Sequence, residues 1–278
     1  VTDASGASPA FEHQYPVCTA GVLSRYILDE RLASAAVGAG AELRATTSVE
    51  GLIMRGHTVC GVRLQRDDGK IEGVSAPITV MASGALSSLR TPRPRQPVGF
   101  AMRRYFDGVR WEGPSAFEIV LPLEVGGIPV AGYGWVFPMA GDRANVGVGY
   151  WSSPRQRFRL PRVLRAFEKA LMREDPRFSG AQPERRVIGA PISAGGSAQN
   201  CAAPGLLLVG DAAGLANPYL GDGIAQALES GMAAAAARRM ACRDRPILNG
   251  VVRRLEEGLP SGAHVAGAFL EAHANVSG

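Results

Sequence analysis

The sequence contains no apolar run long enough to cross a bilayer, and no charged-then-apolar start of the kind that opens a signal peptide. We therefore expect a cytoplasmic protein. Cysteine is scarce: the four residues form no Cys-x-x-Cys pair and have no spacing with histidine that suits zinc. Free thiols in a reducing compartment are the expectation. The cysteines are Cys18, Cys60, Cys201 and Cys242.

Lysine is almost absent, and 28 of the 30 basic residues are arginine. The formal net charge of the chain is +5. No basic groove with interleaved aromatic residues is present, so we predict no nucleic-acid partner. The arginine-rich stretches 90–104 and 155–165 are interpreted as solvated surface, with peripheral contact to anionic lipid headgroups as the alternative. The four histidines show no spacing typical of a catalytic triad or a metal site. We therefore predict no catalytic side chain and no metal.

The chain has enough apolar residues for a globular core, with 46% hydrophobic and 20% charged among 278 residues. A helical pattern opens at Leu23 and is ended by the glycines at 38–40. Three strands with tight turns follow, and four half-buried strands lie beyond a Pro-rich crossing at 91–97. The predicted strands are 49–54, 58–65, 70–80, 100–107, 115–121, 134–138 and 144–151. Further helices are predicted at 155–173, 246–259 and 261–273.

Residues 205–231 are the most informative stretch. A short apolar run at 206–209 is followed by Gly210, Asp211 and a glycine-rich loop. The run predicts a strand buried on both faces, and a helix is predicted from about Asp222 onward. A carboxylate, a glycine loop and a helix N-terminus then meet at the carboxyl end of one strand, where α/β sheets bind ligands. The alternative is an ordinary connection in which Asp211 caps the helix.

The residues Gly-Asp-Ala-Ala-Gly-Leu-Ala-Asn-Pro-Tyr-Leu-Gly-Asp-Gly-Ile at 210–224 resemble the second flavin motif of the p-hydroxybenzoate-hydroxylase-like flavoproteins, and within them the geranylgeranyl reductase family. The resemblance implies that FAD is the cofactor and that Asp211 hydrogen-bonds its ribityl chain. It also implies that the amides of 221–224 face the N1–C2=O edge of the isoalloxazine. The cofactor-binding residues predicted in this stretch are Gly210, Asp211, Pro218, Gly221, Asp222, Gly223 and Ile224.

Two further stretches resemble flavin-contacting parts of the same proteins. Residues 23–43 resemble a helix whose arginine, here Arg25, lies near the flavin; a surface arginine at a helix end is the alternative. Residues 81–90 resemble the third flavin motif, but Ser83 stands where the family has aspartate. That aspartate is tied to pyrophosphate and nicotinamide-nucleotide handling, so NAD(P)H is only a candidate electron donor. A strand-end turn without a ligand is the alternative at Ser83.

The residues Tyr-Gly-Trp-Val-Phe-Pro at 133–138, with Asn-Val-Gly-Val-Gly at 145–149, resemble the geranylgeranyl reductase motif. Tyr133, Trp135 and Phe137 alternate along a predicted strand and therefore share one face. In flavoproteins of this type that face forms the substrate pocket, so the resemblance implies that these three residues bind substrate. A broad aromatic wall suits a long hydrocarbon. Packing in a core beneath helices is the alternative.

Family members begin with a strand, Gly-x-Gly-x-x-Gly and a helix that holds the pyrophosphate of FAD. Residues 1–21 contain no such unit. We therefore expect a mixed α/β (α+β) fold with an incomplete Rossmann-like FAD-binding domain and its β-meander, plus an antiparallel-sheet substrate domain. The predicted FAD-binding parts are 1–92 and 183–240, the substrate domain is 93–182, and a helical tail covers 241–278.

Three functions are consistent with these motifs. The first is an FAD-dependent oxidoreductase that reduces C=C bonds of a polyprenyl substrate by hydride transfer from reduced flavin N5. The second is an aromatic-ring monooxygenase, which needs NAD(P)H and oxygen. The third is a truncated remnant that binds flavin weakly or not at all. A hydrophobic, isoprenoid small molecule is the expected partner, and a homo-oligomer or a completing second chain are further alternatives.

Overall fold

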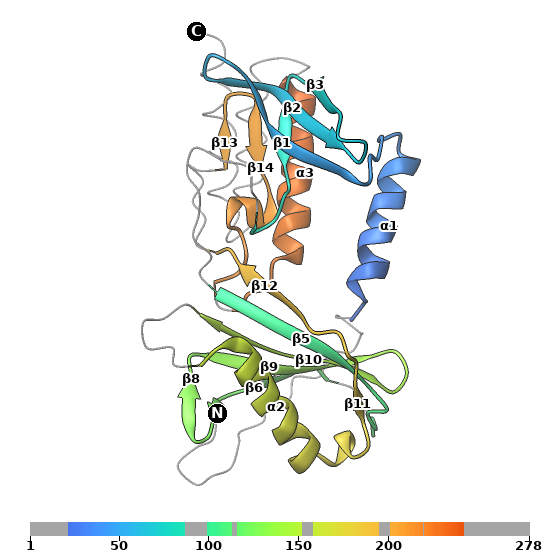
Figure 1. Cartoon of the computed structure of the whole chain (residues 1–278), viewed down its shortest axis with the longest axis vertical. Coiled ribbons are helices and arrows are strands. Elements are labelled where there is room, and N and C mark those ends of the chain that lie inside the picture. The colour runs from blue at the N-terminus through green and yellow to red at the C-terminus, as the bar shows by residue number, and fades with distance from the viewer. Residues whose placement is uncertain are drawn as a thin grey trace. The chain divides into compact units, whose positions relative to one another are not determined.

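The computed structural model describes residues 22–86, 99–112, 116–151, 158–194, 201–218 and 220–241, and Figure 1 shows their helices and strands. The described residues of Val1–Leu43 and Phe100–Ala190 form one compact unit, the sheet unit, and those of Arg44–Gly99 and Pro191–Gly278 form a second, the meander unit. Several predictions lie outside the described residues: the Pro-rich crossing, the helices at 246–259 and 261–273, Cys18, Cys242, His13, His264 and His273.

A six-stranded sheet forms the centre of the sheet unit. Its strands lie in the order β11-β5-β10-β9-β6, and β12 also pairs with β5. β10 pairs antiparallel with β9 along their whole length. The strands predicted at 100–107, 134–138 and 144–151 are confirmed, whereas the strand predicted at 115–121 is only three residues long. The bounds are β5 Gly99–Asp107, β6 Glu118–Val120, β9 Gly132–Met139, β10 Arg143–Trp151, β11 Gln182–Pro183 and β12 Ile188–Ile192.

Helix α2 (Leu160–Glu174) covers one face of this sheet (Figure 1). Val163 and Phe167 of the helix pack in one core cluster with Val136 and Val146 of the sheet. The predicted helix start at 155 is wrong, because the helix begins only at Leu160 with a proline in its first turn. Proline is tolerated there since the first-turn N–H groups have no partner inside the helix.

A β-hairpin of β7 (Leu123–Val125) and β8 (Ile128–Val130) was not predicted. Its two-residue loop is Gly126-Gly127, with φ of +60° and +73°. Two consecutive positive φ angles define the type I′ turn that suits the twist of a tight hairpin, and glycine adopts them without steric cost. This glycine pair was the signal available in the sequence. The hairpin adds Leu123, Val125 and Val130 to the core beneath α2.

Helix α1 (Arg25–Gly38) confirms the helix predicted before the glycines at 38–40. It has no buried residue, however, and Leu32 is 45% exposed. The helical spacing of its leucines therefore does not mark a core-facing stripe in this structure. Tyr26 at its first turn accepts a hydrogen bond from Arg186, whose guanidinium also lies 5.6 Å from the tyrosine ring centre.

The meander unit contains an antiparallel three-stranded sheet of β1 (Thr47–Arg55), β2 (Thr58–Arg66) and β3 (Ile71–Ser75), which confirms the meander. The third predicted strand, 70–80, is wrong as a single element. The chain leaves the meander after β3, and β4 (Thr79–Met81) joins another sheet. Pro77 lies between the two strands and cannot donate a ladder hydrogen bond, which separates them.

The second sheet of this unit has the order β13-β14-β4, with β13 at Ala202–Ala203 and β14 at Leu206–Leu208. β14 runs parallel to β4, and all three of its leucines are buried, as predicted for a strand covered on both faces. Helix α3 (Ile224–Ala241) confirms the helix predicted near Asp222. Figure 1 shows α3 beside β14, and Ala234 packs in the same core cluster as the strand.

Candidate functional site

The chain turns sharply where β14 ends. Gly210 adopts φ of +55° and begins the short 3-10 helix η3 (Gly210–Ala213). A Cβ at this position would lie 3.1 Å from the Cβ of Ala227, so glycine also allows the turn to pack closely against α3. The amide of Gly210 donates to the hydroxyl of Ser230 at 3.0 Å, and that hydroxyl donates to the carbonyl of Gln226 at 2.6 Å. Sequence reasoning missed the buried Ser230, which ties the turn to the helix.

Asp211, the first residue after this turn, lies beside the start of α3. A Cβ added to Gly223 would lie only 2.9 Å from Oδ1 of Asp211. The carboxylate is therefore brought against the backbone that leads into the helix, where a larger residue than glycine would displace it. The structure thus brings together Asp211 and Gly223, both predicted from the sequence as cofactor-binding residues. Whether they hold a cofactor stays a prediction.

The loop between η3 and α3 is closed by its own backbone. The amide of Asn217 donates to the carbonyl of Asp222 at 2.7 Å, and the amide of Gly221 donates to the carbonyl of Asn217 at 2.8 Å. At the helix start, the amide of Ile224 donates to Oδ1 of Asp222 at 3.3 Å. The carboxylate of Asp222 therefore caps the first turn of α3. Pro218 in the same loop is exposed.

This arrangement suits an electron-rich ligand. The first N–H groups of an α-helix have no acceptor inside the helix, and the helix dipole places partial positive charge at the same end. A carboxylate nearby accepts hydrogen bonds from hydroxyl groups of a ligand. A site of this kind can bind a polyol chain through Asp211 and an electron-rich carbonyl edge through the start of α3.

A cavity of about 420 Å³ lies in the meander unit at the carboxyl end of β4. Its lining is mainly apolar and includes Ser83, the residue found where the flavin motif has aspartate. The hydroxyl of Thr79, on β4, is buried and has no hydrogen-bond partner in the described part of the chain. The lining residues are Ser48, Val49, Leu52, Val62, Thr79, Val80, Met81, Ala82, Ser83 and Leu86.

Tyr133, Trp135 and Phe137 share the sheet face opposite α2. Gly134, between the first two, points toward α2, because a Cβ there would lie 2.7 Å from the ring of Phe167. The ring centres of Tyr133 and Trp135 are 6.0 Å apart, and those of Trp135 and Phe137 are 6.1 Å apart. These three rings form a continuous surface, the aromatic wall. None of them belongs to the core beneath α2, although Trp135 is itself buried on its own face of the sheet, with 9% of its surface exposed.

Trp135 is held flat on the sheet by residues of β10. Its indole N–H donates to Oδ1 of Asn145 at 3.2 Å. A Cβ at Gly147, the direct cross-strand partner of Trp135, would lie 2.1 Å from the indole ring. The glycine therefore provides the space in which the ring lies, and the asparagine sets its orientation. The resemblance pointed to this segment, but a role for Asn145 was not predicted.

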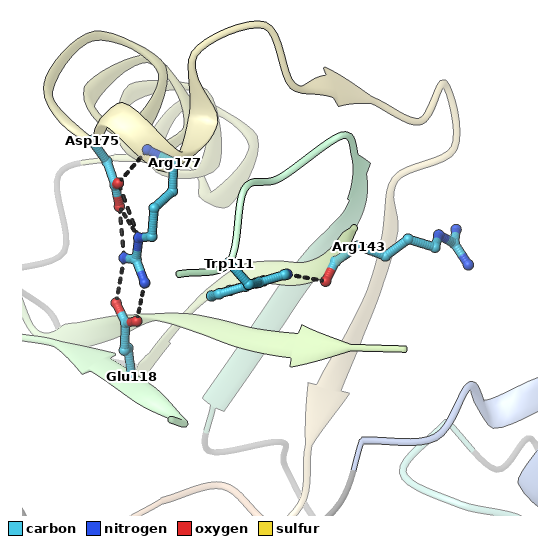
Figure 2. Close-up of polar contacts among 5 residues, drawn as sticks. All are labelled: Trp111, Glu118, Arg143, Asp175 and Arg177. Atoms are coloured by element: carbon cyan, nitrogen blue, oxygen red, sulfur yellow. Dashed lines mark hydrogen bonds and ion pairs between the residues drawn. The ribbon is translucent and has the colours of Figure 1, made fainter. Parts of the chain in front are cut away.

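The charge cluster of Figure 2 lies on the α2 side of the same sheet. Arg177, on the short helix η1 (Pro176–Phe178), places Nη2 2.8 Å from Oε2 of Glu118 and 2.7 Å from Oδ2 of Asp175. Its hydrogen bonds hold the pKa of Asp175 below the ordinary value, and the two carboxylates raise the pKa of Arg177. The guanidinium also lies 5.4 Å from the ring centre of Trp111. Asp175 and Arg177 are therefore ionised and paired at neutral pH.

Two other predicted features are placed as follows. Arg25 lies at the start of α1 and pairs with Asp29 at 2.9 Å, with more than half of each side chain exposed. Its proximity to a flavin stays a prediction. His57 is exposed, and neither Cys60 nor Cys201 is part of a disulfide. Within the described part of the chain, no group of three or more His, Cys, Asp or Glu side chains could hold a metal ion.

Glu168 of α2 is the one buried acid whose pKa shifts upward among the residues that the structure describes. Burial raises its pKa, although Arg104 lies 3.1 Å away and opposes the shift. The pair joins α2 to β5 and is not part of the aromatic wall. None of the helices in the described ranges combines the length and apolar character needed to span a membrane.

No family model matches the sequence. The chain is 31% identical over 252 residues to digeranylgeranylglycerophospholipid reductase 2 of Methanococcoides burtonii, an alignment that covers 80% of this chain and 54% of that protein. It is 32% identical over 228 residues to menaquinone reductase of Mycolicibacterium smegmatis, with 78% of this chain and 53% of the relative covered. The chain thus spans about half the length of these curated relatives.

Among solved structures, the fold is similar to that of a geranylgeranyl bacteriochlorophyll reductase-like protein from Thermoplasma acidophilum. The TM-score is 0.68 at 26% sequence identity, over 91% of this chain and 63% of that one. The predicted mixed α/β fold with a meander and an antiparallel sheet is confirmed by this likeness and by the strand order.

Proposed function

We propose that this chain, which is a relative of the geranylgeranyl reductases, is an FAD-dependent oxidoreductase that reduces carbon–carbon double bonds of an isoprenoid substrate. The named relatives act on different lipids, a digeranylgeranyl glycerophospholipid and menaquinone. A hydrophobic substrate with an isoprenoid chain is the class that we propose for this chain.

The residues of the meander unit fit FAD. Asp211 would accept a hydrogen bond from the ribityl chain, and the backbone at Gly223 would face the carbonyl edge of the ring, next to the Ile224 amide that donates to Asp222. The close approach of Asp211 to Gly223 supports this fit, because a side chain at Gly223 would fill the space beside the carboxylate. When bound and reduced, FAD supplies a hydride to the substrate double bond. Asp211 holds the cofactor, and the start of α3 stabilises negative charge on it.

The aromatic wall fits the hydrocarbon. Tyr133 and Phe137 would offer half-buried apolar surface on either side of the buried Trp135, and an alkene bound there would be shielded from water. The indole of Trp135 is oriented by Asn145 before any substrate binds, which reduces the entropy lost on binding. Apart from the phenol of Tyr133, the wall carries no acid or base, in keeping with a reaction whose chemistry would reside in the cofactor.

The contact of Asp211 with Gly223 is the observation that carries the proposal. The test is to titrate the purified 278-residue chain with FAD and to record the visible spectrum and flavin fluorescence. Asp211→Ala should weaken FAD binding about 10–150-fold, because a charge-assisted hydrogen bond contributes roughly 1.5–3 kcal/mol. Asp68→Asn, which removes an exposed carboxylate of the same unit, should leave binding unchanged. Equal affinity of wild type and Asp211→Ala would contradict the assignment.

The electron donor and the surroundings of the protein are part of the same proposal. We infer that NAD(P)H is the candidate electron donor. We also infer that the protein is cytoplasmic and makes peripheral contact with the membrane that holds its substrate. Flotation with liposomes of anionic lipid measures that contact. NADPH oxidation that is stimulated by a phenolic acid and not by an isoprenoid would instead indicate the aromatic monooxygenase. A chain that remains colourless with added FAD would indicate the non-catalytic remnant.

A further inference from the structure

Strand β6 extends the aromatic wall by one strand. It pairs with β9 so that Ile119 lies directly opposite Trp135, and Glu118 lies opposite Val136. Phe117, just before the strand, has its ring centre 4.9 Å from that of Phe137. Phe117 and Ile119 are each 45% exposed, so their apolar surfaces continue the wall toward solvent.

β6 is held only weakly by the strand ladder, although Val120 packs against the core beneath α2. It is an edge strand of three residues and pairs only with β9 in the described chain. Short edge strands depend on contacts outside the ladder for a defined position. Side chains alternate along a strand, so Glu118 points to the opposite face from Phe117 and Ile119.

On that opposite face, Glu118 meets Arg177 in a two-point contact, which Figure 2 shows. Nη2 of Arg177 lies 2.8 Å from Oε2 of Glu118, and Nη1 donates to Oε1. The arginine is itself anchored, because its backbone carbonyl accepts from the amide of Arg110 and its side chain binds Asp175. A bidentate guanidinium–carboxylate pair fixes both distance and orientation, unlike a single hydrogen bond.

We propose that Arg177 and Glu118 are positioning residues, which hold β6 so that Phe117 and Ile119 bind the distal part of the hydrocarbon and set the chain length that is preferred. This inference rests on the proposed function, since it takes the aromatic wall as the surface that binds the isoprenoid chain. A short chain is covered by the rings of β9 alone. The added isoprene units of a longer chain continue past these rings onto Phe117 and Ile119 of the neighbouring strand.

The test compares isoprenoid alcohols of increasing length. Tritiated geraniol, farnesol and geranylgeraniol are bound to the 278-residue chain, and the bound fraction is separated by gel filtration. Phe117→Ala should weaken geranylgeraniol binding about tenfold, which corresponds to losing one aromatic contact, and leave geraniol binding unchanged. Arg177→Met should change the ratio of the geranylgeraniol and geraniol affinities by the same factor. Arg177→Lys keeps the charge, so its affinity ratio should lie between those of wild type and Arg177→Met.

Arg173→Met is the matched control. Arg173 lies near the end of α2, is mostly exposed and pairs with Glu174 rather than with β6. The Arg173→Met variant should leave the affinities for geraniol, farnesol and geranylgeraniol unchanged. If Arg177→Met does not fold, as judged by far-UV circular dichroism, Glu118→Gln takes its place, since it keeps the shape of the side chain and removes the charge. Its geranylgeraniol affinity should fall about threefold, the effect of weakening one ionic hydrogen bond.

The possible failures are distinguishable. A wild-type chain that binds none of the three alcohols overturns the proposed function and this inference with it. A wild-type chain that prefers geranylgeraniol, combined with an unchanged affinity ratio in Phe117→Ala and in the Arg177 or Glu118 variants, overturns only the inference. An equal loss for all three alcohols also overturns it, because that result indicates a general loss of structure instead of a selective loss at β6.

Discussion

Replacing Gly147 by alanine tests the geometry of the aromatic wall directly. The added Cβ would lie 2.1 Å from Cζ2 and 2.4 Å from Cε2 of Trp135. The indole must move by roughly 1.4 Å to restore an ordinary carbon–carbon contact of about 3.5 Å. A movement of that size also breaks the hydrogen bond from the indole to Asn145, which is 3.2 Å long in the native state.

The expected change in the free energy of unfolding follows from the steric clash and the lost hydrogen bond. Overpacking costs about 1–3 kcal/mol, and the lost hydrogen bond costs about 1 kcal/mol. Alanine restricts the unfolded chain more than glycine does, which returns roughly 0.4–1 kcal/mol. The free energy of unfolding of Gly147→Ala should therefore be about 2 kcal/mol lower than that of wild type.

Gly149→Ala is the matched control, because Gly149 lies two residues along the same strand and on the same face. A Cβ there makes only ordinary contacts, at 3.7 Å and beyond. This variant should be as stable as wild type or more stable by about 0.5 kcal/mol.

The assay is urea unfolding followed by near-ultraviolet circular dichroism, which reports the environment of the tryptophans. Gly147→Ala should show an earlier transition and a changed native spectrum, and it should bind isoprenoid alcohols weakly. If Gly147→Ala and Gly149→Ala unfold at the same urea concentration with the same spectrum, the indole does not lie over Gly147. The wall would then have no defined geometry.

Two further predictions concern the other charged groups. Gly223→Ala should weaken FAD binding several-fold and leave the free energy of unfolding unchanged. The added Cβ would lie 2.9 Å from Oδ1 of Asp211, and the flexible carboxylate yields by about 0.5 Å. The control is Gly231→Ala, which has open space around it and should leave FAD affinity unchanged while stabilising α3 by about 0.5–1 kcal/mol. The depressed pKa of Asp175, caused by its hydrogen bonds from Arg177, contributes stability that is present above the ordinary carboxyl range of about pH 4 and is lost as the pH falls below it. Asp175→Asn should therefore unfold at lower urea than wild type at pH 7, and the difference should shrink toward pH 2; a difference that is constant with pH would contradict the ionised pair.

Local pattern predicted most of the regular elements. The apolar run of β14, the amphipathic stripe of α2 and the alternation along β9 and β10 each produce their own element, because burial of one face or both faces sets the periodicity. The strand–loop–helix pattern also predicted that Asp211 meets the glycine loop and the start of the following helix. A turn that brings a carboxylate against a helix start is built from a few consecutive residues, so it can be read from the chain.

Predictions failed where a distant segment decides the outcome. The run 70–80 has one continuous β-like pattern, yet its two halves join different sheets, because β4 finds its partner in β14 more than a hundred residues later. The stripe of α1 has no partner in the described structure, although its spacing predicts one. Whether an apolar face is buried depends on what packs against it, and spacing alone does not contain that information.

The sequence by itself determined the class of fold, the strand–turn–helix unit at Asp211 and the alternation that places three aromatic rings on one face. Only the tertiary structure decided which face is covered by α2, that Asn145 and Gly147 orient Trp135, and that Arg177 reaches Glu118 across 59 residues of chain. Those contacts join segments distant in sequence. These long-range contacts depend on how the surfaces of separate helices and strands pack together. The local elements depend on backbone geometry and on the spacing of apolar residues.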